Sequence, residues 1–418
     1  MQAVIALPDH HESKDATDEL LFREICGIPL LVRTIATAAR AGAHQVLLIF
    51  AGHYPSQISR QLCESKLLSV SPRLEFVLVP GFDPSSPSRW EEIAGRLEHE
   101  FLWLPWNWVT NKHSLHKLPV LEHNPGKWNV PARLRRDSVF LPVENSPAAV
   151  QKPEGIAAVS ESSVNAAERW LVANSGKPLD GIYTSFNRRL CRPLVRTLTH
   201  TRVTPNAVTV VGLLVGIVSA YCFSKGFYLT SVLGALLFFL SGLCDEVDGM
   251  LARLKFSDSP FGTWFEGYVD NLSYLLLFGG IAIGLYRRRG PQELWIGGAI
   301  LVGAMSSVAV ISWLRKRSTH ADRPNEYLAK MYGLLDKDRA NWISRVARNV
   351  EFLLKKGVFV HYVVLFSLLG LLPVMKRLAA FAANLTWILA LYFSRRFFRS
   401  PRPIDEAVQF QQAAKVNL

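Results

Sequence analysis

The chain has 418 residues, of which 49% are hydrophobic, and its formal net charge is +13. This length allows two domains, and a basic chain suits either nucleic acid or anionic lipid headgroups. The sequence has no zinc-ligand spacing, no aromatic RNA-binding motif and no basic helix followed by heptads, so we expect no nucleic-acid partner. The five cysteines form no Cys-x-x-Cys pair, which argues against a structural zinc site and a disulfide framework.

The first 155 residues alternate short strand patterns with helical patterns. Strands are predicted over 4–7, 45–51 and 74–79, and helices over 30–41, 55–68 and 90–100. This order predicts an α/β, Rossmann-type layer with a mostly parallel sheet. The N-terminus lacks a basic region followed by an apolar core, so we expect no signal peptide.

Part of this region, from Gly27 through Ala43 and the strand after it, resembles the nucleotidyltransferases that make CDP- and UDP-linked alcohols and sugars. Those enzymes hold a triphosphate with a glycine-rich loop after the first strand and a metal with an acid after a later strand. Here the loop over 8–14 has no glycine, and the stretch over 101–110 has no carboxylate. We therefore interpret residues 1–155 as a degenerate nucleotidyltransferase-like soluble domain.

A linker and a connecting helix are predicted over 156–179, and strongly apolar segments follow them. Six such segments cover residues 207–223, 229–243, 272–286, 294–314, 358–374 and 378–393. They predict an all-α polytopic domain of about six transmembrane helices over 180–399, followed by a tail over 400–418. Basic residues concentrate in 315–356 and in the tail, which predicts that the tail, the N-terminal domain and the active site face the cytoplasm from the cell inner membrane. The arginines at 287–289 then fall on the outer side, against the usual rule.

Three arginines stand just before the first apolar segment, namely Arg192, Arg196 and Arg202. Two interpretations stay open: they anchor the chain at the headgroup level, or they bind the phosphate of an anionic acceptor or lipid. Thr204 and Pro205 follow. Threonine is a favoured N-cap and proline a favoured first-turn residue, so this pair predicts the start of a helix.

The residues with the strongest signal for a site are four carboxylates at helical spacing, Asp245, Asp248, Glu266 and Asp270. They stand at the ends of apolar segments, where charge is costly, so a functional role is the first interpretation. Facing carboxylates repel unless cations lie between them, and hard oxygen ligands suit Mg²⁺ or Mn²⁺. Gly249 and Ala252 leave room on the same face, and Arg253 is a natural phosphate partner.

This stretch resembles the signature of the CDP-alcohol phosphotransferases, Asp-x2-Asp-Gly-x2-Ala-Arg-x8-Gly-x3-Asp-x3-Asp. Every fixed position matches except the third acid, which is Glu266. The family's Thr-Pro-Asn-x-x-Thr motif also matches, at Thr204, Pro205 and Asn206.

The resemblance implies transfer of a phosphoalcohol group from a CDP-linked donor to an acceptor hydroxyl, with release of CMP, in phospholipid biosynthesis. It also implies that the four acids hold two Mg²⁺ or Mn²⁺ ions and that Asp270 is the general base. The residues implied to border the nucleotide are Gly249, Ala252, Arg253, Gly262, Thr204, Pro205 and Asn206.

Three functions are compatible with these features. The first, which is our prediction, is a membrane CDP-alcohol phosphotransferase. The second is a bifunctional enzyme, similar to the fused inositol-phosphate cytidylyltransferase and di-inositol phosphate synthases, whose α/β domain makes the CDP-alcohol. The third is a catalytically silent membrane scaffold. The donor is open between CDP-diacylglycerol and a CDP-polyol attacked by a lipid hydroxyl. Many members of the family are homodimers, but the residues leave the oligomeric state open.

Overall fold

The computed structural model describes residues 1–8, 19–52, 72–141, 153–176, 181–318 and 356–397, with a few positions over 62–68 and 333–345. Spatial contacts divide the chain into two compact units. The first unit contains Met1–Pro178, Arg188–Pro205 and Val247–Ser259, and the second contains Leu179–Asn187, Asn206–Glu246 and Pro260–Leu418. The α/β region thus shares a unit with two segments of the chain that follow it. The domain boundaries predicted from the sequence, at residues 155, 179 and 399, stay a prediction.

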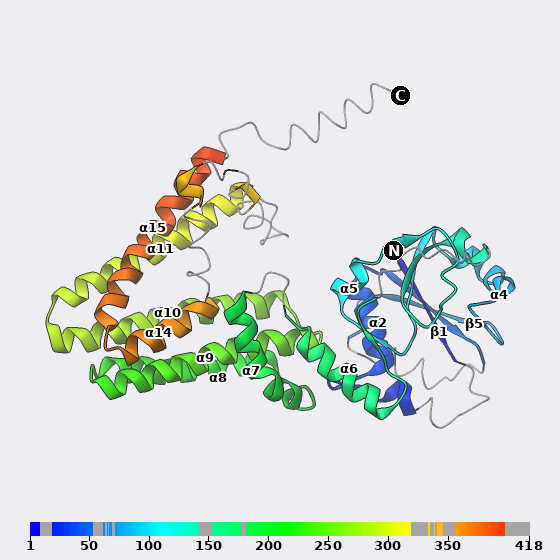
Figure 1. The fold of residues 1–418 in the computed structure, drawn as a ribbon, viewed down its shortest axis with the longest axis horizontal. Coiled ribbons are helices and arrows are strands. Elements are labelled where there is room, and N and C mark those ends of the chain that lie inside the picture. Colours follow the sequence, from blue (N-terminus) through cyan, green and yellow to red (C-terminus); the bar gives the residue numbers. More distant parts are fainter. Residues whose placement is uncertain are drawn as a thin grey trace, which may run out of the picture. The chain divides into compact units, whose positions relative to one another are not determined.

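The first unit contains a six-stranded sheet in the order β5-β4-β1-β6-β9-β8. Strands β1 and β5 of this sheet are labelled in Figure 1. Its strands are β1 (Gln2–Leu7), β4 (Gln45–Phe50), β5 (Arg73–Leu78), β6 (Glu100–Trp103), β8 (Val120–Leu121) and β9 (Ala132–Arg135). β1 pairs in parallel with β4 and β6, β4 pairs in parallel with β5, and β9 runs antiparallel to β6. The predicted α/β layer with a mostly parallel sheet is confirmed.

Side chains of β1 alternate between two hydrophobic cores because successive residues of a strand point to opposite faces of the sheet. Ala3 and Ile5 belong to the core that contains helix α2 (Leu30–Arg40), whereas Val4 belongs to the core that contains Trp90. A central strand that is covered on both faces appears in the sequence as a nearly continuous apolar run, and this pattern predicts such a strand.

The smaller elements of this region are two strand pairs and several short helices. They are β2 (Glu24–Ile25), β3 (Ile28–Pro29), β7 (Trp108–Val109), β10 (Ile156–Ala157), α4 (Pro87–Glu91), α5 (Lys112–His116), the 3-10 turns Ala94–Arg96 and Arg136–Phe140, and the connecting helix α6 (Glu161–Ala173). The helix predicted over 90–100 is too long. Its apolar positions Trp90, Ile93 and Leu97 are buried, but the backbone of Leu97 is extended and leads into β6. The helix predicted over 55–68 and the glycine-free loop over 8–14 fall almost entirely outside the described residues.

Seven longer helices follow α6 in the described part of the chain. They are α7 (Ile182–Thr199), α8 (Pro205–Ser224), α9 (Tyr228–Leu254), α10 (Pro260–Arg289), α11 (Gln292–Ser318), α14 (Lys356–Leu368) and α15 (Leu372–Phe397). Of these, α8, α9, α10, α11 and α15 are long and apolar enough to cross a membrane, and Gly357–Leu368 is a shorter apolar helix. The predicted all-α membrane region is confirmed.

The apolar run predicted over 358–374 is not one continuous helix. Gly370 takes a left-handed φ of +69°, which ends the helical path after α14, and the last residues of the run begin α15. A left-handed residue just after a helix is a common helix end, and glycine adopts it without a steric cost.

Small residues let α8 contact α9 and α10 closely. A Cβ built on Gly284 of α10 would lie 2.1 Å from the carbonyl oxygen of Phe223, and one on Gly280 would lie 2.4 Å from that of Ala220. Nearer the start of α8, the Ser241 hydroxyl of α9 donates to the carbonyl oxygen of Gly212 at 2.7 Å. These contacts hold α9 and α10, the helices with the acidic motif, against one common neighbour.

Candidate metal centre

Three of the four motif acids lie together. Asp245 and Asp248 stand one turn apart on α9, Glu266 stands near the start of α10, and one carboxylate oxygen from each lies within 4.8 Å of the others. Asp248 is only 3% exposed, whereas Asp245 and Glu266 are half-buried. Three oxygen ligands at this separation can hold a divalent cation such as Mg²⁺ or Mn²⁺, which would offset their mutual repulsion.

Buried apolar residues on α9 determine which side of the helix its two acids occupy. Val247, Met250 and Leu251, which alternate with the motif residues, are buried in the protein. With these apolar side chains fixed by packing, helical spacing directs Asp245 and Asp248 to the remaining side of the helix.

Asp270 stands one turn beyond Glu266 on α10 and is half-buried. It is not part of the three-residue group at the 4.8 Å separation. Gly262, the second glycine of the signature, lies in the first turn of α10 and is also half-buried.

Arg253 lies back along its own helix toward Gly249. A Cβ built on Gly249 would lie 3.4 Å from Nη1 of Arg253, and Nε of Arg253 donates to the carbonyl oxygen of Ser175 at 2.6 Å. A larger residue at position 249 would therefore push this guanidinium away from its present place. Ala252, the small residue that follows Gly249 in the motif, is half-buried on α9.

The predicted helix start after Thr204 agrees with the structure, in which α8 begins at Pro205. The segment before it is tied to the end of α9, because Nζ of Lys255 donates to the carbonyl oxygens of Thr201 and Val203 at 2.6 and 3.0 Å. Asn206, the third residue of this motif, lies in the first turn of α8.

Two of the three arginines before α8 contact α6. Arg196 donates to Glu168 at 3.3 Å and to Asn165 at 2.8 Å, and Arg192 donates to the carbonyl oxygen of Ala173 at 3.2 Å. Arg202 is exposed. These contacts give Arg192 and Arg196 a structural role, and their part in binding an acceptor or lipid phosphate stays a prediction.

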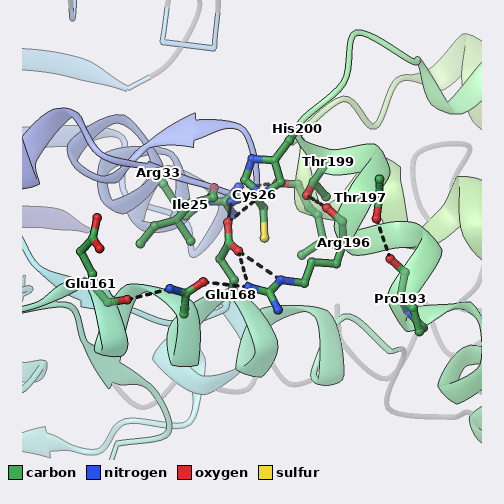
Figure 2. Close-up of polar contacts among 12 residues, drawn as sticks. Ile25, Cys26, Arg33, Glu161, Glu168, Pro193, Arg196, Thr197, Thr199 and His200 are labelled. Atoms are coloured by element: carbon green, nitrogen blue, oxygen red, sulfur yellow. Dashed lines mark hydrogen bonds and ion pairs between the residues drawn. The ribbon is translucent and has the colours of Figure 1, made fainter.

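Two buried charged residues near these segments were not singled out from the sequence. Glu168 of α6 and Arg33 of α2 are 4% and 3% exposed. Figure 2 shows the Glu168 carboxylate in contact with the Cys26 turn, with Arg196 and with His200. The available signal was that each lies on the apolar face of a helix, where an unpaired charge would be costly.

Comparison with known proteins agrees with the motif. Residues 202–393 match the family model described as CDP-alcohol phosphatidyltransferase. The archaetidylinositol phosphate synthase of Pyrococcus horikoshii is 32% identical over 26% of this chain and 55% of its own length. The phosphatidylinositol phosphate synthase of Cutibacterium acnes is 24% identical over 46% of this chain and 92% of its own length.

A third relative, the bifunctional IPC transferase and DIPP synthase of Aquifex aeolicus, is 23% identical over 55% of this chain and 48% of its own length. The chain thus spans about half the length of the first and third of these relatives and nearly all of the second. The apolar helices and the family match indicate an integral membrane protein, whose residues 202–393 form a CDP-alcohol phosphatidyltransferase family-model domain.

Proposed function

We propose that this protein transfers a phosphoalcohol group from a CDP-linked donor to an acceptor hydroxyl and releases CMP, as a step in phospholipid biosynthesis. The observation that carries the proposal is the meeting of Asp245, Asp248 and Glu266 within 4.8 Å inside the matched domain. Acids at the ends of apolar segments mark functional sites, and a silent scaffold would have no need to bring three of them this close.

In the proposed reaction the acceptor oxygen attacks the phosphorus that carries the alcohol, and the bond from this phosphorus to the oxygen of CMP breaks. Asp270 takes the proton of the attacking hydroxyl, while Asp245, Asp248 and Glu266 hold the cations. Two bound Mg²⁺ or Mn²⁺ ions supply charge neutralisation at the diphosphate and at the departing CMP. The residues that hold the nucleotide are Thr204, Pro205, Asn206, Gly249, Ala252, Arg253 and Gly262.

Glu266 departs from the family pattern by one methylene. The added length moves a carboxylate by about 1 Å relative to aspartate at a fixed backbone, which matters in an octahedral Mg²⁺ site. Its proximity to Asp245 and Asp248 supports a metal-binding role for the longer side chain.

The names of two relatives bear on the acceptor. One is named an archaetidylinositol phosphate synthase and the other a phosphatidylinositol phosphate synthase. This favours a lipid donor and a phosphorylated polyol acceptor, and we propose that Arg192, Arg196 and Arg202 supply the positive charge for the phosphate of this acceptor. Transfer from a CDP-polyol to a lipid hydroxyl is the alternative, and analysis of the lipid product distinguishes the two.

We propose that residues 1–155 form a degenerate nucleotidyltransferase-like domain without activity of its own. The stretch after β6, over 104–110, contains no carboxylate to hold a metal. The alternative is a bifunctional enzyme, since one relative carries that name. Incubation of the full chain with CTP, a polyol phosphate and Mg²⁺ tests this, with Asp248→Ala present to block the second step. We expect no release of pyrophosphate, and release above background would support the alternative.

The site and the α/β region are proposed to face the cytoplasm from the cell inner membrane, and the enzyme is proposed to act on membrane lipids, alone or as a homodimer. The proposed activity is tested on membranes that contain the protein, with CDP-diacylglycerol and an inositol phosphate supplied. We expect CMP and a new phospholipid in equal amounts, both lost on chelation with EDTA and restored by Mg²⁺ or Mn²⁺. CMP release that is insensitive to chelation would contradict the proposal.

A further inference from the structure

We propose that the α/β region holds the last turns of α9 in place, and that Arg33 is a positioning residue which fixes the end of α9 and thereby Asp248. This inference rests on the proposed function for its biological meaning. The contacts that carry it lie within the first unit, which includes both the α/β region and the segment Val247–Ser259.

Arg33 links the α/β region directly to the end of α9. Its Nη2 donates to the carbonyl oxygen of Leu254 at 2.7 Å, and its Nε donates to that of Ile25 at 2.9 Å. Leu254 is the last residue of α9, and the last four carbonyl groups of a helix have no partner within the helix. A buried guanidinium at this point satisfies one of them and matches the negative end of the helix dipole. Leu254 lies less than two turns beyond Asp248, so the contact fixes the same stretch of helix.

The backbone conformation just after α9 is determined by tertiary contacts. Phe256 takes a left-handed φ of 52°, although a bulky aromatic residue rarely adopts this conformation. The guanidinium carbons of Arg33 and Arg40 lie 5.2 and 5.8 Å from the centre of the Phe256 ring, and Nη2 of Arg40 donates to the Phe256 carbonyl oxygen at 3.0 Å. Such a conformation is strained for a residue other than glycine and persists only where the surroundings determine it. Here the surroundings are two arginines of α2.

A second set of contacts fixes the segment before α8. The backbone N–H of Cys26 donates to Oε1 of Glu168 at 2.9 Å, and Nε2 of His200 lies 2.9 Å from the same oxygen (Figure 2). The turn that carries Cys26 is tight, because both Cys26 and Gly27 have positive φ, and a Cβ on Gly27 would lie 2.2 Å from the Thr199 carbonyl oxygen.

The two sets of contacts form a closed ring. Arg33 joins Ile25 to Leu254, and Lys255, the next residue, joins the end of α9 to Thr201 and Val203. His200 and Cys26 then return to Glu168. The ring therefore fixes, relative to one another, the residue before the Thr204–Asn206 motif and the last turns of the helix that carries Asp248. In this proposal the α/β region, which lacks the residues for nucleotidyl transfer, has the role of keeping these two segments in a fixed relative position.

The test uses the full chain purified in detergent, with Arg33→Lys and Phe256→Gly as the main variants. Lysine keeps the charge but loses the planar fork that reaches two carbonyl oxygens. Glycine accepts the left-handed φ without strain while removing the aromatic contact. Arg96→Ala is the matched control, because Arg96 belongs to the same region but pairs with Glu75 at 2.8 Å, away from α9.

Two readouts do not need turnover. Mn²⁺ affinity, measured by electron paramagnetic resonance, is expected to fall about tenfold in Arg33→Lys and in Phe256→Gly, as for other residues that orient metal ligands. Hydrogen–deuterium exchange of the amides over 249–257 is expected to rise in both variants. Neither quantity is expected to change in Arg96→Ala.

CMP release supplies a third readout. The positioning role predicts that kcat falls in both variants while the KM for the CDP-linked donor changes little. Mn²⁺ affinity and amide exchange that stay at wild-type values in both variants would overturn the proposal. If the wild-type protein releases no CMP, the proposed function fails, but reduced Mn²⁺ affinity in the variants would still support the positioning role.

Discussion

Asp245 and Glu266 belong to different helices, yet their carboxylates share one small space with an oxygen–oxygen separation within 4.8 Å. Both helices pack against α8, through the Ser241 hydroxyl on α9 and through Gly280 and Gly284 on α10. The separation of the two acids is therefore set by helix packing that depends on small residues.

A change at Gly280 is expected to disturb this packing. The substitution Gly280→Val places its Cβ 2.4 Å from the carbonyl oxygen of Ala220, a backbone atom that moves only if the helix moves. We expect a destabilisation of about 1–3 kcal/mol or more, as for other overpacked interiors, seen as a lower Tm in detergent. The neighbouring Gly279 has no atom within 4 Å of a built Cβ, so Gly279→Ala is expected to leave the Tm unchanged or slightly raised. Equal effects of the two changes would contradict close helix contact here.

Two substitutions at Glu266 test the length and the charge of this side chain separately. The substitution Glu266→Asp keeps the charge but withdraws the oxygen by about 1 Å, so we expect a higher Mg²⁺ concentration for half-maximal CMP release. The substitution Glu266→Gln keeps the length but removes the charge, and we expect CMP release to fall on the order of 100-fold. Wild-type Mg²⁺ dependence in both variants would remove Glu266 from the site.

Cys26 supplies a prediction about pH. Burial, with a smaller contribution from the Glu168 carboxylate, raises the pKa of the Cys26 thiol to about 11. In the unfolded state the thiol has a pKa of about 8.5. Over the pH range between the two pKa values, the folded state therefore keeps a proton that the unfolded state loses. Because the folded state binds more protons, this thiol makes unfolding easier as the pH rises from about 9 to about 11.

The prediction is measured as alkylation of each cysteine by iodoacetamide, mapped by mass spectrometry. Cys26 is expected to remain unmodified at pH 8.5 in the folded protein and to react fully in denaturant. The stability difference between the wild type and Cys26→Ala is expected to change with pH only above about pH 9. Rapid alkylation of Cys26 in folded protein would show that the turn is open to solvent.

Glu293 and Lys376 form a buried ion pair between α11 and α15, with Oε2 and Nζ 2.5 Å apart. Nζ of Lys376, which is 0% exposed, also donates to the Glu293 carbonyl oxygen at 2.7 Å. Replacing one partner leaves the other charge buried, which typically costs about 3–5 kcal/mol. We expect Lys376→Met and Glu293→Gln each to lower the Tm strongly and the double variant to recover part of the loss. Additive losses would indicate that the two side chains do not interact.

Prediction from the sequence succeeded for features that depend on a single helix or strand. The strands of the sheet and the proximity of Asp245 to Asp248 follow from local periodicity, because each depends on a single strand or helix. The break at Gly370 was missed because hydropathy does not register backbone conformation. The roles of Arg33 and Glu168 could not be predicted, since their partners Leu254 and His200 lie far away in the chain and come close only through tertiary packing.

The most direct test of the account is CMP release by membranes that contain the wild type or Asp248→Asn, compared at equal protein level and saturating Mg²⁺. Asparagine has the size of aspartate but lacks its charge, so the variant is expected to insert and fold while its CMP release falls to background. Release at the wild-type rate by Asp248→Asn would contradict the assignment of these acids to a metal that serves phosphoryl transfer.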